Sequence, residues 1–155
     1  MTSHFIKTNI QYSISMDANE MAENIDEILL DKIKYKIGNK CIKEGYIDRD
    51  SIQILSRSFG KINTSHFKGT IQYNTLLSVN ICNPMEGEKT KCKIISINKM
   101  GILAENAPIT IVIARQHHSN KSEIDNKKIG DIIEATIIAK RFELYDDKIT
   151  AICQL

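Results

Sequence analysis

The chain has 155 residues, of which 42% are hydrophobic and 26% are charged. This composition can bury a core, but the length suits one domain or two very small ones rather than a large enzyme. The formal net charge is +2, with 10 acidic and 10 basic residues in 1–86 and 9 acidic and 11 basic residues in 87–155. That basic excess is too small to identify a nucleic-acid-binding protein by itself.

The sequence predicts neither a membrane span nor an export signal. The longest apolar runs, such as 109–114, are far shorter than the roughly 20 residues of a membrane helix. The N-terminus lacks a basic segment followed by an apolar one. We therefore expect an intracellular protein without a membrane partner.

The first half opens with a predicted strand at 5–15, in which the large apolar residues recur mostly at even positions. Asp17, followed three residues later by Glu20, is typical of a helix start. Apolar residues at helical spacing then predict an amphipathic helix of about 20 residues that stops at Gly38.

Two β-rich pieces follow the predicted helix, at 51–55 and 70–81, and glycines and polar residues separate them. The first half is therefore predicted to be an α+β domain with one helix on a small antiparallel sheet. Since one helix covers only part of such a sheet, we expect an exposed apolar face.

Pro84 and Gly87 mark the boundary to an all-β second half. Five strands are predicted, at 90–97, 102–105, 109–114, 131–140 and 148–153. Five is the strand count of an OB barrel. Gly101 suits the sharp bend between the first two strands. Residues 116–128, which show no apolar periodicity, would connect the third strand to the fourth.

Several segments form an ordered set along nearly the whole chain. Residues 98–105, Asn-Lys-Met-Gly-Ile-Leu-Ala-Glu, precede Pro108 and the strand at 109–114, and the joint at 84–88 reads Pro-Met-Glu-Gly-Glu. Upstream lie Gly45, Tyr46, Ile47, Gly60, Gly69 and Tyr73. In this order, the segments resemble the stalk subunit of multisubunit RNA polymerases, the counterpart of the seventh subunit of eukaryotic RNA polymerase II and of the archaeal E subunit.

The resemblance implies two domains with different tasks. Residues 1–86 would form a tip domain that docks on the RNA polymerase core subunits and on a smaller helical stalk subunit. Residues 87–155 would form the OB barrel that binds nascent single-stranded RNA through phosphate contacts, without reading its sequence. In this family the stalk supports transcription initiation. The implied interface with the polymerase and the stalk partner comprises Gly45, Tyr46, Ile47, Gly60 and Pro84.

OB barrels usually hold single strands near the ends of their strands, so basic and aromatic residues there are candidates for RNA contact. For each of them, ordinary solvated surface charge is the alternative. The family often has an aromatic residue after the bend glycine, where this chain has Ile102 and Leu103, so base stacking is expected to be poorer. The candidates are Lys93, Lys99, Arg115, Lys140, Arg141 and Phe142, with Lys91 close by.

The sequence contains no recognisable catalytic, metal or cofactor constellation. Asp146 and Asp147 stand between two predicted strands and fit a hairpin turn better than a metal site. His117 and His118 have no cysteine or carboxylate at ligand spacing and fit an exposed loop better than a metal site or a catalytic base. The four cysteines form no C-x-x-C pair and are expected to be buried, reduced thiols, with a metal or redox role as the alternative. We expect a non-catalytic protein without a cofactor.

Composition also bears on the source of the chain. The sequence is rich in Ile, Lys and Asn and has only four arginines, a bias typical of AT-rich genomes. A large DNA virus that encodes its own polymerase fits this bias, which would place the protein in the host cytoplasm and the virion; a cellular relative would be nuclear. Two other functions remain open: a free-standing OB-fold RNA-binding protein acting in translation or RNA decay, and a structural adaptor that has lost RNA binding.

Overall fold

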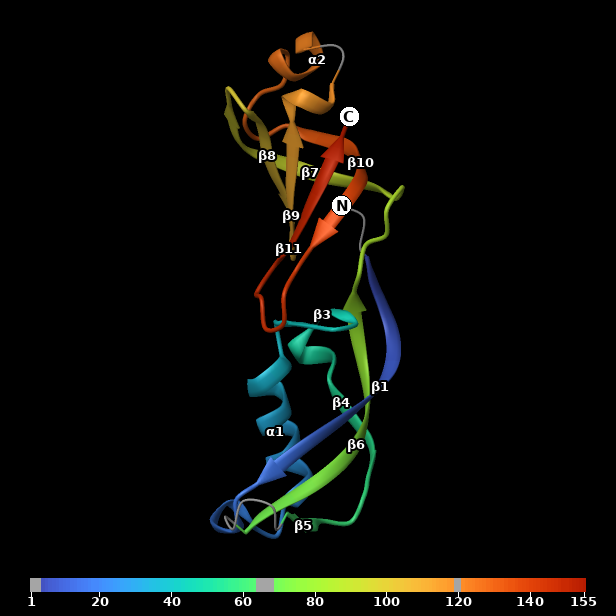
Figure 1. The fold of residues 1–155 in the computed structure, drawn as a ribbon, viewed down its shortest axis with the longest axis vertical. Helices are drawn as coiled ribbons and strands as arrows, with labels where there is room; N and C mark the ends of the chain where they lie inside the picture. Colours follow the sequence, from blue (N-terminus) through green and yellow to red (C-terminus); the bar gives the residue numbers. More distant parts are fainter. Residues whose placement is uncertain (1–3, 64–68, 119–120) are drawn as a thin grey trace. The chain divides into compact units, whose positions relative to one another are not determined.

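The computed structural model describes residues 4–63, 69–118 and 121–155 (Figure 1). The chain divides into two compact units. The first, here called the barrel unit, comprises Met1–Phe5, Lys40–Tyr46 and Cys82–Leu155. The second, the helix unit, comprises Ile6–Asn39 and Ile47–Ile81. The units therefore interleave along the chain, because residues 40–46 cluster with the C-terminal part.

Five strands of the barrel unit close into a barrel in the order β10-β11-β9-β8-β7. Strand β11 runs parallel to β9, whereas β7 is antiparallel to both β8 and β10. This five-stranded mixed barrel confirms the predicted OB-like architecture. The strands are β7 (Lys89–Asn98), β8 (Gly101–Asn106), β9 (Ile109–Ala114), β10 (Ile132–Arg141) and β11 (Ile149–Gln154).

Alternation of inward and outward side chains builds the core of the barrel; it is strict along β9 and β11 and is interrupted by bulges on β7 and β10. On β9 the inward side chains are Ile109, Ile111 and Ile113, all at most 1% exposed. Small residues such as Ala104 and Ala151 face them from neighbouring strands and leave room for the isoleucines. The period of two visible in the sequence is thus the period of burial.

The connection between β9 and β10 has more structure than the sequence predicted. It contains the 3-10 turn η3 (Arg115–His117) and the short helix α2 (Lys121–Asp125). Ile124 of α2 is fully buried in the barrel core. The predicted connection between the third and fourth barrel strands is confirmed. The sequence did not predict its helix, because the helix has one buried apolar residue and no apolar period.

A short hairpin that the sequence did not predict belongs mostly to the barrel unit. Its strands are β2 (Cys41–Ile42) and β3 (Gly45–Ile47). Two backbone hydrogen bonds fasten it to the β10–β11 loop: Cys41 N–H donates to Asp146 O, and Tyr145 N–H donates to Cys41 O, both at 2.7 Å. The hairpin thereby holds this loop at one end of the barrel.

In the helix unit, the long strands β1 (Phe5–Met16) and β6 (Thr70–Cys82) are neighbours in a sheet. Strands β4 (Gln53–Arg57) and β5 (Lys61–Asn63) pair antiparallel with β6. Helix α1 (Ile25–Ile37) packs on the sheet and on the 3-10 turn η2 (Arg49–Ser51), as Figure 1 shows. Its buried face consists of Leu29, Ile33 and Ile37, each 0% exposed.

The predicted helix is shorter and starts later than expected. Asp17 and Glu20 do form a capping box, with Asp17 N–H donating to the Glu20 carboxylate at 3.2 Å, but they close only the 3-10 turn η1 (Ala18–Glu20). The backbone is extended at Met21, and α1 begins at Ile25 with 13 residues. The predicted end is confirmed, since Gly38 N–H donates to Lys34 O at 3.0 Å as the C-cap. No helix among the described residues is long and apolar enough to span a membrane.

Candidate nucleic-acid interface

A row of polar side chains runs across the outside of all five barrel strands. Register pairs Lys93 on β7 with Glu105 on β8, Glu105 with Thr110 on β9, Thr110 with Thr150 on β11, and Thr150 with Arg141 on β10. Two of the predicted RNA-binding residues, Lys93 and Arg141, are thus brought to the two ends of one row. Glu105 stands within this row and lowers its positive potential.

The neighbouring outward row on the same strands is neutral. Leu103, Val112, Ile152 and Ala139 follow one another across β8, β9, β11 and β10. Leu103 and Val112 are half-buried and Ile152 is 39% exposed, whereas Ile102 faces inward. The face that binds ligands in OB barrels therefore offers aliphatic contacts rather than aromatic stacking.

Lys99 lies in the tight β7–β8 turn at one end of the barrel. The Asn98 side chain shapes this turn, because its Oδ1 accepts from Met100 N–H at 2.9 Å and from Gly101 N–H at 3.1 Å. Lys99 and Met100 are both exposed at its tip. A backbone phosphate can reach Lys99 here without competition from a described ion pair.

Arg115 lies at the same end but has a partner within the chain. Its N–H donates to Met100 O at 3.1 Å, and its guanidinium bonds the Asp125 carboxylate of α2 at 2.9 Å. The Nε atom is buried and has no partner among the described atoms. The pair with Asp125 leaves Arg115 less available to RNA than the exposed lysines.

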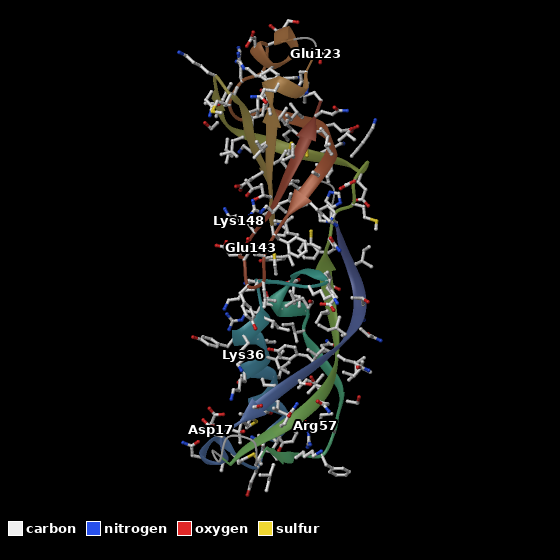
Figure 2. All side chains as sticks on the ribbon, viewed as in Figure 1. Asp17, Lys36, Arg57, Glu123, Glu143 and Lys148 are labelled. Atoms are coloured by element: carbon white, nitrogen blue, oxygen red, sulfur yellow. The ribbon has the colours of Figure 1, made fainter. Side chains whose placement is uncertain are left out.

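The other three candidates lie at the opposite barrel end, beside the β10–β11 loop that carries Glu143 and Lys148 in Figure 2. Lys140 Nζ donates to Asn83 Oδ1. Arg141 is 3.4 Å from the Glu143 carboxylate, and both side chains are largely exposed, so this pair is weak. Phe142 packs against the barrel core, which leaves little of its ring to stack on a base.

One cation that the sequence reasoning omitted lies on β7. Lys89, Lys91 and Lys93 alternate with buried residues and are all exposed on one face of the strand. Lys89 lies 3.5 Å from Glu134 of β10, and Glu134 is also the register partner of Lys91. The sequence contains a signal for this row of lysines, because lysines recur with the strand period of two in the segment Lys-Thr-Lys-Cys-Lys at 89–93.

The residues predicted to contact the polymerase or the stalk partner are divided between the two units. In the barrel unit, Gly45 and Pro84 are buried, and Tyr46 packs edge-on against Phe5 with ring centroids 6.3 Å apart. In the helix unit, Ile47 is 0% exposed and Gly60 is exposed. Their role in an interface stays a prediction.

One residue of the histidine pair and one of the aspartate pair have local structural partners. His118 Nδ1 lies 3.0 Å from Ala114 O, and its Nε2 accepts from Leu155 N–H at 2.9 Å, so this ring ties the β9–β10 connection to the end of β11. Asp146 Oδ2 accepts from Glu143 N–H at 2.8 Å, which confirms its predicted place in a turn. Among the described residues, no three His, Cys, Asp or Glu side chains gather as a metal site.

Burial raises the pKa of all four cysteine thiols, to about 11 for Cys41 and Cys92 and to about 12 for Cys82 and Cys153. Each is free and buried. At neutral pH these groups are protonated, and a protonated thiol is a poor nucleophile and a poor metal ligand.

The raised thiol pKa values predict alkaline destabilisation. Below pH 9, the ordinary thiol value, both states are protonated and the stabilisation is fully present. Between pH 9 and about 11–12 the unfolded chain loses protons first, so the free energy of unfolding should fall by up to about 1.4 kcal/mol per pH unit for each thiol. Urea titrations across this window should show a shallower decline for a Cys92→Ala, Cys153→Ala variant than for the parent. Equal slopes would contradict the assignment.

Comparison with known proteins shows a similarity to a viral protein. No family model matches the sequence. The chain is 26% identical over 165 residues to a protein of Acanthamoeba polyphaga mimivirus that carries the name of a DNA-directed RNA polymerase subunit. The aligned region covers 99% of this chain and 82% of the viral protein.

Proposed function

We propose that this protein is a non-catalytic subunit of a virus-encoded, DNA-directed RNA polymerase and that it occupies the stalk position. The observation that carries the proposal is the similarity to the mimivirus protein along 99% of the chain. A match confined to the barrel would fit any OB-fold RNA-binding protein, whereas this match includes the residues of both units.

The barrel is the part that we assign to RNA. OB barrels bind oligonucleotides on their second and third strands and adjoining loops. The row from Lys93 to Arg141 and the exposed Lys99 supply cations on and beside that surface. Without an exposed aromatic on the second and third strands, contact falls mainly on phosphates, which carry no sequence information. Such a surface suits a transcript whose sequence varies.

We assign assembly to residues 1–86, which would dock on the polymerase core subunits and on a smaller helical stalk subunit. Exposed apolar side chains on the helix unit, including Phe59 at 95% exposure, support a role as a binding surface. A virus-encoded polymerase of this kind would act in the host cytoplasm and be packaged in the virion.

Affinity purification tests the assignment. The tagged chain, expressed in cells infected with its source virus, should bring down the large polymerase subunits in stoichiometric amounts after nuclease treatment. The nuclease removes partners that are held only by shared RNA. Recovery of ribosomal or RNA-decay proteins in place of polymerase subunits would support the free-standing RNA-binding protein and reject the polymerase subunit.

A further inference from the structure

The helix unit contains a groove of about 730 Å³ between the first half of α1 and the strand β4. Asp26, Glu27 and Leu30 line it from the helix. The opposite wall is β4 itself, followed by Phe59. A strand added to a sheet edge lies about 4.8 Å from its neighbour, and this groove runs along the whole of β4.

The edge of β4 that faces away from β6 has no partner among the described strands. Strand β4 pairs only with β6, and a bulge between Ile54 and Ser56 interrupts that pairing. Ser58 N–H donates to Asn74 O of β6 at 2.8 Å. Because successive amides of a strand point to opposite sides, the N–H of Arg57 points away from β6. An open edge of this kind is a template for an added strand.

Apolar side chains concentrate along this edge. Leu55 is 52% exposed and Phe59 is 95% exposed, while Ile54 and Leu30 are half-buried in the groove. Ile62 on β5 is 66% exposed. Phenylalanine at this exposure is unusual for a surface that stays in water, and with its apolar neighbours it indicates a surface that a protein covers.

The charges that line the groove indicate the charge of the segment that binds there. Figure 2 shows Arg57 on the strand side, and its Nε bonds the Asp26 carboxylate of α1, which neutralises that pair. Glu27 is exposed on the helix wall and has no described ion-pair partner. A basic side chain on the occupant can therefore pair with Glu27, whereas an acidic one would be repelled.

From these features we propose that the groove binds an extended segment of another polymerase polypeptide. The segment adds a strand to the free edge of β4, places apolar side chains against Leu30, Leu55 and Phe59, and sets a lysine or arginine against Glu27. This inference rests on the proposed function, because that function supplies the neighbouring polypeptide. A helix would fill the volume but would leave the Arg57 amide unpaired.

Hydrogen exchange at two adjacent amides distinguishes an added strand from a helix or another protein surface that covers the groove. In the purified complex, the amide of Arg57 should exchange about as slowly as that of Ser58, which is already bonded within the sheet. If Arg57 exchanges more than about 100-fold faster than Ser58 in the complex, no strand is added and the proposal is wrong. The comparison is internal to one molecule, so differences in global stability cancel.

Photo-crosslinking and charge reversal identify the occupant. A benzophenone side chain at position 59 should crosslink to an extended, basic segment of a polymerase polypeptide. The same probe at Ile6, which is 71% exposed on β1 and outside the groove, should not. Glu27→Lys should reduce the crosslink from position 59 at least tenfold, and Lys7→Glu, an exposed charge reversal on β1, should change it less than twofold. A crosslink to a second copy of this chain or to a helix overturns the proposal.

Failure of the groove and failure of the proposed function give different results. If polymerase subunits purify with the chain and Arg57 exchanges rapidly, the function stands and the groove proposal falls. If the chain purifies with other proteins only, the proposed function falls. The crosslinked segment then belongs to another class of protein, which overturns the occupant proposed here even where Arg57 is protected.

Discussion

Replacing Gly101 by alanine should destabilise the barrel by about 4 kcal/mol, at the upper end of what a single substitution does. Gly101 opens β8 with φ of +150°, and a Cβ there would lie 2.0 Å from the backbone oxygen of Ile113. Since the obstructing atom belongs to the β8–β9 ladder, it cannot move aside without breaking the pairing of Gly101 with Ala114. Valine should do at least as much damage.

Gly130→Ala is the matched control in the same unit. Gly130 has φ of +95° but nothing lies within 4 Å of its would-be Cβ, so alanine there should cost only the backbone strain, about 1 kcal/mol. Urea unfolding followed by circular dichroism measures both variants. Equal losses at the two positions would mean that φ alone, and not the contact with Ile113, makes Gly101 necessary.

The strands of the barrel could be predicted because the residues within each strand show the local pattern of a strand. Alternation in 109–114 and the glycine at 101 are local signals, and burial in the structure follows the same period. The hairpin at residues 41–47 had no such signal. Strand β2 is two residues long, and its partner outside the hairpin is the Asp146 backbone, more than 100 positions away. Pairings that distant are invisible in a single sequence.

The predicted start of the helix and the predicted availability of Arg115 to RNA were wrong for a related reason, because both depend on contacts between residues that are apart in the sequence. The capping box of Asp17 and Glu20 is real, but Glu20 also bonds Lys32 Nζ of α1 at 2.8 Å, so it serves a 3-10 turn packed against the helix. Arg115 was predicted from its place after a strand, whereas its guanidinium is held by Asp125 across the β9–β10 connection. The position of Arg115 after a strand correctly placed it at an end of the barrel, but it did not reveal that Asp125 competes with RNA for its guanidinium.

Replacing Lys93, Lys99, Lys140 and Arg141 together by glutamate should abolish binding of single-stranded RNA. The four cations are exposed or half-exposed on the barrel, and the change moves the formal net charge from +2 to −6. Parent binding should be weak and indifferent to sequence. The logarithm of its affinity should fall with the logarithm of salt concentration at a slope of about −1.4 to −2.8, as expected for two to four phosphate contacts at about 0.7 each. Fluorescence anisotropy with unstructured RNAs measures both quantities.

The control applies the same charge change to the helix unit, with glutamate at Lys7, Lys34, Lys36 and Lys61. If position matters, this variant keeps most of its RNA affinity and the barrel variant keeps none; if net charge alone drives binding, both lose it equally. The barrel variant should still assemble with the polymerase, because assembly is assigned to residues 1–86. Loss of assembly would mean that the barrel, too, contacts the polymerase. If the parent does not bind RNA even at low salt, the RNA assignment is wrong and the subunit is an adaptor. The neutral row of Leu103, Val112 and Ile152 would then be a surface for binding protein.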